Sequence, residues 1–397
     1  MRSPAILFLL LAACATPGND TGDPGDTATT DTGPGCRAGT PDPGGTRYGL
    51  VSHPYTPSGG QADAWEVVAL APDGTVSLPG TFVTMGRATE GTVRFSPDGS
   101  LGITIQDDGS IGVFTFGADG TISVADPHFA DDGAGGTFYA TDAWIDPSGE
   151  RAYVVDGDWR DGGGGLYEVD LDCATGTPTA GGLVAPSKLG AHLLPTADGR
   201  AIYVAADVLD GTGDDAYLLD LDGPSVLGGV PLWPDDQAIT GGAAMGGDGS
   251  YLLVGDNSAF SDVSNRVGIA HLDGDALSFV QIVTPLEDPG AIGTWGAATL
   301  VASGFGDALY GLSFDAENDP PFALDGELTY AGSSPQIPSS ITVVPGPDGD
   351  GWMLVAEVSA IRVVRASPDG TLIDQGPFDF GSGLDHIVGA LGVQPWR

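Results

Sequence analysis

Short apolar stretches separated by Gly, Asp and Pro residues follow one another along most of this chain. Some are nearly continuous, such as 151–155, and others alternate apolar and polar positions, such as 166–171 and 217–221. Alternation with a period of two is typical of β-strands, and short continuous apolar runs fit strands that are buried on both faces. No long stretch has the 3.6-residue period of an amphipathic helix. The pattern predicts an all-β protein of short strands and tight turns.

A turn motif that ends in Gly recurs about every 50 residues, at 96–99, 146–149, 196–199, 246–249 and 346–349. Near position 298 the motif is not recognisable, and Trp295-Gly296-Ala297-Ala298 takes its place. Asp and Gly favour hairpin turns, because Gly accepts a positive φ and Asp accepts hydrogen bonds from its own backbone. About 50 residues accommodate four strands with their turns, which is the size of one propeller blade. Because residues 48–397 hold seven such repeats, the sequence predicts a seven-bladed β-propeller of four-stranded antiparallel blades.

The two ends of this region are expected to share one blade. Residues 48–51 and 65–70 have the pattern of a second and a third strand, and 386–393 has that of a first strand with no blade after it. A blade completed by both ends closes the ring and leaves no unpaired edge between the first and last blades. Residues 47–397 are therefore predicted to form one propeller.

The turns are followed by Tyr-Val pairs, as in Tyr153-Val154 and Tyr203-Val204. This pattern resembles the seven-bladed propellers of the lactonase-like and Tyr-Val-Thr-Asn repeat families. The resemblance covers the whole body of the chain and implies the propeller fold. It is specific to the turn and not to an active site, and one fold carries many functions. Lactonase-like hydrolysis is therefore one activity that the resemblance implies, beside a binding role.

The first 14 residues have the parts of an export signal in order: Met1-Arg2, the apolar stretch 5–11, and Leu11-Ala12-Ala13-Cys14. The last four resemble the lipobox of bacterial lipoproteins, in which the signal is cut before the cysteine and the thiol is lipidated. The resemblance implies that residues 1–13 are removed and that Cys14 anchors an extracytoplasmic protein in the cell envelope, at the outer membrane. Residues 14–46, rich in Thr, Asp, Gly and Pro, are predicted to be a disordered tether.

Two further cysteines, Cys36 in the tether and Cys173 in the propeller, leave two alternatives open. In an oxidising compartment they would form a disulfide that holds the tether against the propeller. The other alternative is that both thiols are free.

The chain has 54 acidic and 13 basic residues, with a formal net charge of −41. A surface this acidic repels phosphate backbones, so nucleic acid is excluded as a partner and the membrane is expected to be contacted only through the lipid. Half of the Asp residues adjoin Gly, which favours solvated turn positions over calcium binding or adaptation to salt. An extracytoplasmic protein, glycan or small molecule is the expected partner of a monomeric chain.

No nucleophile elbow, phosphate-binding loop or Cys-x-x-Cys motif occurs in the sequence, so a site must be located from the repeat. The residues that enter the first strand of each blade surround one mouth of the central channel. Repeat counting places Thr92, Asp142 and His192 there, and the closing blade adds Asp385 and His386. Loops that enter these strands carry the remaining candidate binding residues, which are Arg87, Glu90 and Lys188.

The candidate catalytic residues are His192, His386, Asp142 and Asp385. They could form an acid–base pair that opens a lactone, or hold a divalent metal together with Glu90. The alternative is a polar channel mouth filled with water. Residues 156–162 resemble a calcium loop only superficially, because their acidic residues lack the alternate spacing of such loops. The sequence thus predicts no definite cofactor, and calcium or a similar divalent ion is the one to test. Two competing functions remain: a binding or scaffold module, and a lactonase-like hydrolase.

Overall fold

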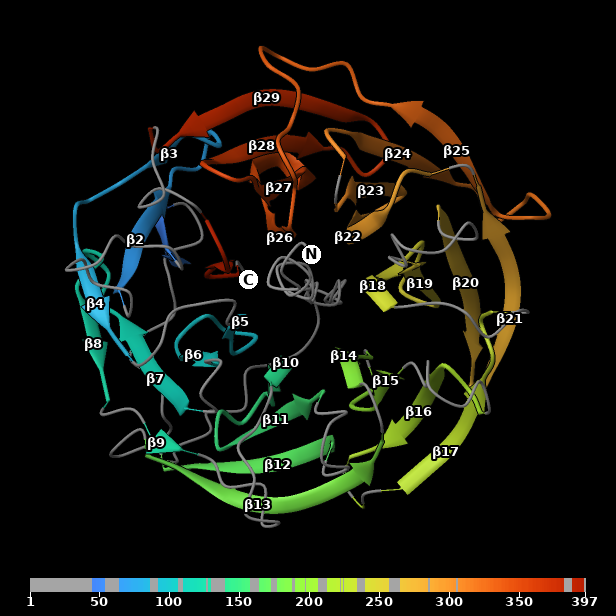
Figure 1. Cartoon of the computed structure of the whole chain (residues 1–397), viewed down its shortest axis with the longest axis horizontal. Helices are drawn as coiled ribbons and strands as arrows, with labels where there is room; N and C mark the ends of the chain where they lie inside the picture. Colours follow the sequence, from blue (N-terminus) through green and yellow to red (C-terminus); the bar gives the residue numbers. More distant parts are fainter. Residues whose placement is uncertain are drawn as a thin grey trace, which may run out of the picture.

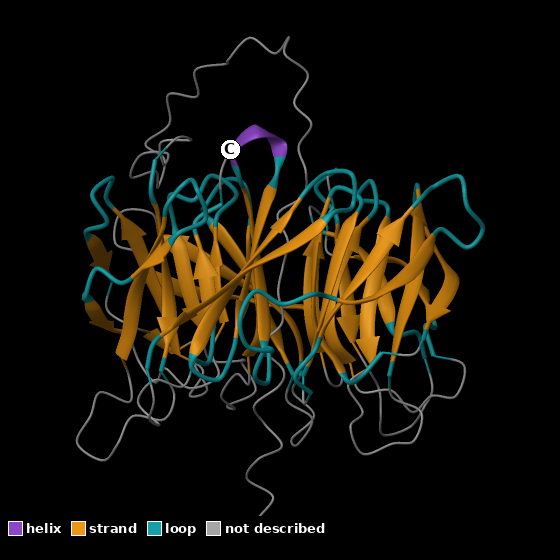
Figure 2. Cartoon of the chain, turned by 90° about the horizontal axis from the view of Figure 1, so that it is seen from above, coloured by secondary structure: helices purple, strands orange, loops and turns teal. Residues whose placement is uncertain are grey.

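The computed structural model describes residues 45–53, 64–85, 92–105, 110–125, 128–129, 140–157, 164–172, 177–187, 190–196, 198–205, 213–221, 223, 225–233, 240–256, 265–284, 286–304, 306–381 and 388–395. These residues form seven antiparallel sheets arranged around a central axis (Figure 1). The predicted seven-bladed β-propeller is therefore confirmed. Figure 2 shows a flat disc whose strands run between its two faces, with the 3-10 helix Pro347–Gly349 on one face.

Each blade is built from strands that are consecutive in the sequence, except blade 1, which also takes one strand from the end of the chain. Blade 1 contains β30 (Leu391–Val393), β1 (Arg47–Ser52), β2 (Ala64–Leu70), β3 (Val76–Ser77) and β4 (Phe82–Thr84). Blade 2 contains β5 (Thr92–Phe95), β6 (Gly102–Ile105), β7 (Ser110–Phe116), β8 (Ile122–Val124) and β9 (His128–Phe129). Blade 3 contains β10 (Ala140–Ile145), β11 (Arg151–Asp156), β12 (Gly165–Asp172) and β13 (Thr177–Pro186).

The other four blades each have four strands. Blade 4 contains β14 (Gly190–Pro195), β15 (Ala201–Ala205), β16 (Ala216–Asp220) and β17 (Ser225–Val230). Blade 5 contains β18 (Thr240–Gly246), β19 (Tyr251–Asp256), β20 (Arg266–Asp273) and β21 (Ala276–Val283). Blade 6 contains β22 (Pro289–Trp295), β23 (Ala298–Ser303), β24 (Leu309–Phe314) and β25 (Phe322–Glu327). Blade 7 contains β26 (Ser340–Pro345), β27 (Gly351–Ala356), β28 (Ala360–Ala366) and β29 (Leu372–Asp379).

The hydrophobic core lies between neighbouring blades, which pack face to face. In one cluster, Ile103 of blade 2 packs with Val154 and Val169 of blade 3. The second strand of a blade is buried on both faces, as β11 is, and therefore has the nearly continuous apolar run seen in the sequence. The third strand, such as β12, alternates buried and exposed positions toward its end, and the fourth strand is more exposed still.

The recurring turns have the predicted chemistry. Gly99 and Gly249 have φ angles of 68° and 88°, which favour glycine. The carboxylate of Asp98 accepts a hydrogen bond from the Ser100 amide at 3.1 Å, and Asp248 accepts the equivalent bond from Ser250 at 3.0 Å. These turn aspartates thus stabilise hairpins, as their position beside Gly predicts.

Both ends of the described chain contribute to blade 1. The strand β30 pairs antiparallel with β1, with Gly49 opposite Val393 and Val51 opposite Leu391. The Ala390 amide donates to the Ser52 hydroxyl at 2.7 Å. This confirms the predicted closing strand for Leu391–Val393, whereas residues 386–387 lie outside the described ranges.

Candidate functional site

The innermost strands surround the axis of the disc (Figure 1). Four consecutive ones share an irregularity in their pairing. Near the start of β10, β14, β18 and β22 the pairing with the second strand shifts, between Ala140/Asp142, Gly190/His192, Thr240/Ala243 and Pro289/Ala291. Such bulges re-aim side chains and often lie next to functional sites. The innermost strands of blades 3 to 6 therefore begin with one repeated backbone feature.

A chain of polar side chains crosses three of these innermost strands. Arg94 on β5 donates from Nε to Asp142 Oδ1 on β10 at 2.9 Å, and its Nη2 lies 2.6 Å from the same oxygen. The other Asp142 oxygen accepts a hydrogen bond from the Leu193 amide on β14 at 3.1 Å. His192 completes the chain, and we call Arg94, Asp142 and His192 the mouth cluster.

The imidazole of His192 has different neighbours at its two nitrogens. Nε2 lies 2.5 Å from the Gly241 carbonyl oxygen of blade 5. Because a carbonyl can only accept, Nε2 carries the proton in this bond. Nδ1 faces Asp142 Oδ2 at 3.7 Å, which is too long for a hydrogen bond. The ring is therefore held between the carboxylate of one neighbouring blade and the backbone of the other.

The mouth cluster is enclosed. Asp142 and His192 have no exposed surface, and 13% of the Arg94 side chain is exposed. Burial acts to raise the pKa of Asp142, but the Arg94 charge, His192 and the Leu193 amide together lower that pKa below its usual value. An ionised, hydrogen-bonded Asp142 beside Arg94 can hold three blades in register.

Hydroxyl groups make further bonds between innermost strands of adjacent blades. The Thr92 hydroxyl donates to the Thr141 carbonyl at 3.3 Å, and the Thr141 hydroxyl donates to the Gly190 carbonyl at 2.9 Å. The Thr342 hydroxyl donates to the Leu391 carbonyl at 2.8 Å, which joins blade 7 to blade 1. In each case the partners are 49 residues apart, so these bonds follow the repeat.

Three of the residues chosen by repeat counting lie within the described ranges: Thr92, Asp142 and His192. They come from consecutive blades, and the last two approach each other. The remaining candidates lie outside the described residues, namely Arg87, Glu90, Lys188, Asp385, His386, Cys14, Cys36, Cys173 and 158–162 of the calcium-like loop. Within the described ranges no three His, Cys, Asp or Glu side chains are placed to share a metal ion.

Sequence reasoning missed Arg94, which is the basic member of the mouth cluster. Arg94 lies two residues after Thr92 on β5, so alternation places both side chains on the same face of the strand. It is also one of only 13 basic residues in a strongly acidic chain. Those two signals together could have identified it.

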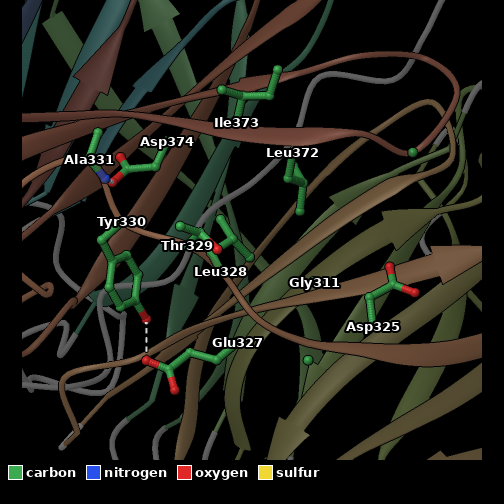
Figure 3. A pocket seen from close by; sticks show the side chains of 12 residues that line it. Gly311, Asp325, Glu327, Leu328, Thr329, Tyr330, Ala331, Leu372, Ile373 and Asp374 are labelled. Atoms are coloured by element: carbon green, nitrogen blue, oxygen red, sulfur yellow. Dashed lines mark hydrogen bonds between the residues drawn. The ribbon is translucent and has the colours of Figure 1, made fainter.

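A second feature, on the rim of the disc, is a hollow of about 520 Å³ between blades 6 and 7 (Figure 3). We call it the rim hollow. Its lining comes from β24, β25, the segment 328–331 and the start of β29. The Tyr330 hydroxyl donates to Glu327 at 2.9 Å and accepts from the Leu309 amide at 2.9 Å. Burial raises the pKa of Tyr330, so this phenol remains protonated at neutral pH.

A buried arginine, Arg362, contacts the wall of the rim hollow and fixes its position. Arg362 donates to Asp374 at 2.7 Å and to the Ser333 carbonyl at 2.9 Å, and it also pairs with Glu357. Its guanidinium lies 5.5 Å from the centre of the Tyr330 ring. These contacts fix the segment between β25 and β26 against blade 7.

Comparison with solved structures finds other propellers. A candidate 6-phosphogluconolactonase from Bacteroides uniformis superposes with a TM-score of 0.64 at 13% identity, over 88% of this chain and 99% of that one. A second, from Bacteroides fragilis, gives 0.61 at 13% identity, over 93% and 99%. The periplasmic gluconolactonase PpgL from Pseudomonas aeruginosa gives 0.63 at 14% identity, over 88% and 100%. No protein-family model and no curated protein matches the sequence. At these identities the likeness establishes the fold alone.

Proposed function

We propose that this chain is a binding module, a rigid propeller that presents its surface to an extracytoplasmic protein, glycan or small molecule. One observation carries the proposal. The acidic and basic side chains of the mouth cluster are largely buried, and their contacts are with neighbouring blades. Groups used in this way stiffen the disc, which supports a role as a rigid scaffold that presents its outer surface to a partner.

The proposal includes an anchor in the cell envelope. Its support is the order of a basic start, an apolar stretch and Leu11-Ala12-Ala13-Cys14 in the sequence. Among the residues that the structure describes, none belongs to a helix with the length and hydrophobicity needed to cross a bilayer. A lipid on Cys14 would hold the disc at a membrane surface, since each buried methylene contributes about 0.8 kcal/mol.

A thermal-shift screen of the purified protein tests the binding role. A ligand that binds only the folded state raises the melting temperature as its occupancy rises. We expect at least one saccharide to raise it, with no chemical change in that compound. A catalysed change in the compound would contradict a purely binding role.

Lactone hydrolysis is the second candidate, and the three lactonase-type neighbours favour it. In that case His192 and Asp142 would act at the mouth, together with residues on the entering loops. The test is the rate of glucono-δ-lactone opening with the wild type, His192→Gln and Thr342→Val. Turnover that disappears only in His192→Gln, with both variants folded, would establish the hydrolase. A rate equal to the uncatalysed one in all three would exclude glucono-δ-lactone as a substrate.

A further inference from the structure

We propose that the rim hollow binds an extended segment of a partner protein that carries a Lys or Arg side chain next to an apolar one. The hollow is lined by residues of β24, β25 and β29, and these strands lie toward the outside of the disc, away from its axis (Figure 1). This second site is independent of any ligand or reaction at the channel.

The charge of the lining selects a cationic side chain. Asp325 and Glu327 of β25 both line the hollow, on either side of Gly326 at an irregularity in the pairing of β24 with β25. They accept hydrogen bonds from the Ser313 and Tyr330 hydroxyls at 2.8 and 2.9 Å, which leaves their negative charge in place. No Lys, Arg or His is among the described residues that line the hollow. The net charge of −41 adds long-range attraction for a basic partner.

The opposite wall supplies apolar surface. Leu372 at the start of β29 borders the hollow and points toward Gly311 (Figure 3). Gly311 on β24 keeps the interior open, because a Cβ there would have Leu372 Cδ1 at 3.5 Å and Asp325 Cβ at 3.7 Å as its nearest neighbours. These are ordinary contact distances, so a larger side chain at this position can fill the hollow without changing its charge.

The strands at the hollow favour a peptide over a free amine. β25 and β29 are the outermost strands of blades 6 and 7, so each has one edge without a strand partner among the described residues. Extended segments bind such edges through their backbone, and alternate side chains then enter neighbouring pockets. A segment alternating basic and apolar residues fits the carboxylates of β25 on one wall and Leu372 on the other.

The site is already formed without the partner. Arg362 and Asp374 are fully buried and paired, and the Asp374 carboxylate also accepts from the Ala331 amide at 2.7 Å. Tyr330 is fixed by its bonds to Glu327 and Leu309. A lining that needs little ordering on binding reduces the entropic cost of the complex.

The test measures binding of a fluorescently labelled peptide of alternating Lys and Val to the purified protein, by anisotropy. We expect Asp325→Asn with Glu327→Gln to weaken binding about tenfold, from the loss of two partly exposed ion pairs. The control is Asp273→Asn with Glu317→Gln, which removes the same charge from exposed hairpin positions of blades 5 and 6. This control should change the affinity for the peptide less than about twofold, because salt screens the attraction from surface charges that lie far from the hollow. Gly311→Leu should also weaken binding, with circular dichroism and the melting temperature confirming the fold of every variant.

Several outcomes would overturn the proposal. Equal loss in the two charge variants would mean that the peptide binds only through net charge. Unchanged affinity in a folded Gly311→Leu variant would place the peptide elsewhere. Equal binding of spermidine, or displacement of the peptide by a neutral oligosaccharide, would assign the hollow to amines or glycans and not to a protein segment.

Discussion

Arg94 and Asp142 are 48 residues apart in the sequence and belong to adjacent blades, yet the Arg94 Nε lies 2.9 Å from the Asp142 carboxylate. Asp142 also accepts a hydrogen bond from Leu193 in the next blade. One carboxylate on an innermost strand therefore links three blades near the axis. The stability of the ring should depend on this side chain more than on the exposed turn aspartates.

Asp142→Asn should lower the free energy of unfolding by about 3 kcal/mol, because it leaves Arg94 largely buried without its carboxylate. Urea unfolding of the wild type and the variant measures this difference. Combining the change with Arg94→Gln should recover part of the loss, since the uncompensated charge is then removed. A double variant with the full sum of the two single losses would show that the pair is not coupled.

The same carboxylate should make stability depend on pH at the acidic end. The pKa of Asp142 is lower in the folded protein than its usual value of about 3.9. Its contribution is therefore complete at neutral pH and is lost as the pH falls below about 4 toward the folded pKa. Urea midpoints measured from neutral pH to about pH 3 should fall more steeply in the wild type than in Asp142→Asn. Parallel curves for the two proteins would contradict this assignment.

Closure of the ring should be sensitive to a single methyl group at Gly49. A Cβ at this position would lie 2.2 Å from the Gly392 carbonyl oxygen, and Gly49 and Gly392 belong to strands that pair with each other. We expect Gly49→Ala to destabilise the protein by about 2–3 kcal/mol through displacement of β30. Gly223→Ala is the matched control, because a Cβ there meets nothing within 4 Å. Equal melting temperatures for the two variants would mean that β30 adjusts freely.

The proposed anchor is tested by Cys14→Ser. The substitution should move the protein from the membrane fraction to the soluble fraction, because the lipid has no attachment site. The melting temperature of the propeller should not change, since residue 14 lies far along the chain from Arg47, where β1 begins. Retention of the variant on membranes would mean that another part of the chain holds it there.

The architecture could be predicted from the sequence because each blade repeats the same local chemistry. The turn glycines require a positive φ, and the second strands are apolar on both faces because each blade is covered by two others. Even the copy near 298 forms a turn, with Gly296 at a φ of 55° between β22 and β23. The 50-residue repeat is supported by many residues along the chain, so one unrecognisable motif did not prevent its detection.

The site was less accessible to sequence reasoning because it depends on backbone irregularity and on contacts between blades. Counting at a fixed offset found Asp142 and His192, but their mutual approach depends on a bulge in each innermost strand. No local pattern marks such a bulge. The rim hollow was missed for a related reason. Its wall is positioned by Arg362, whose partners Ser333, Glu357 and Asp374 come from three separate segments.

The closing blade also determines how the disc would respond to a mechanical load. Force applied at residue 45 enters the ring through β1, which lies between β2 and β30 and is antiparallel to both. A pull along β1 loads the hydrogen bonds on its two sides together, whereas a pull on an outermost strand would open them one at a time. Resistance to forced unfolding follows the unfolding barrier and not the equilibrium stability. A disc held by its amino-terminal end is thus attached through a strand whose hydrogen bonds on both sides must break together, and not one after another.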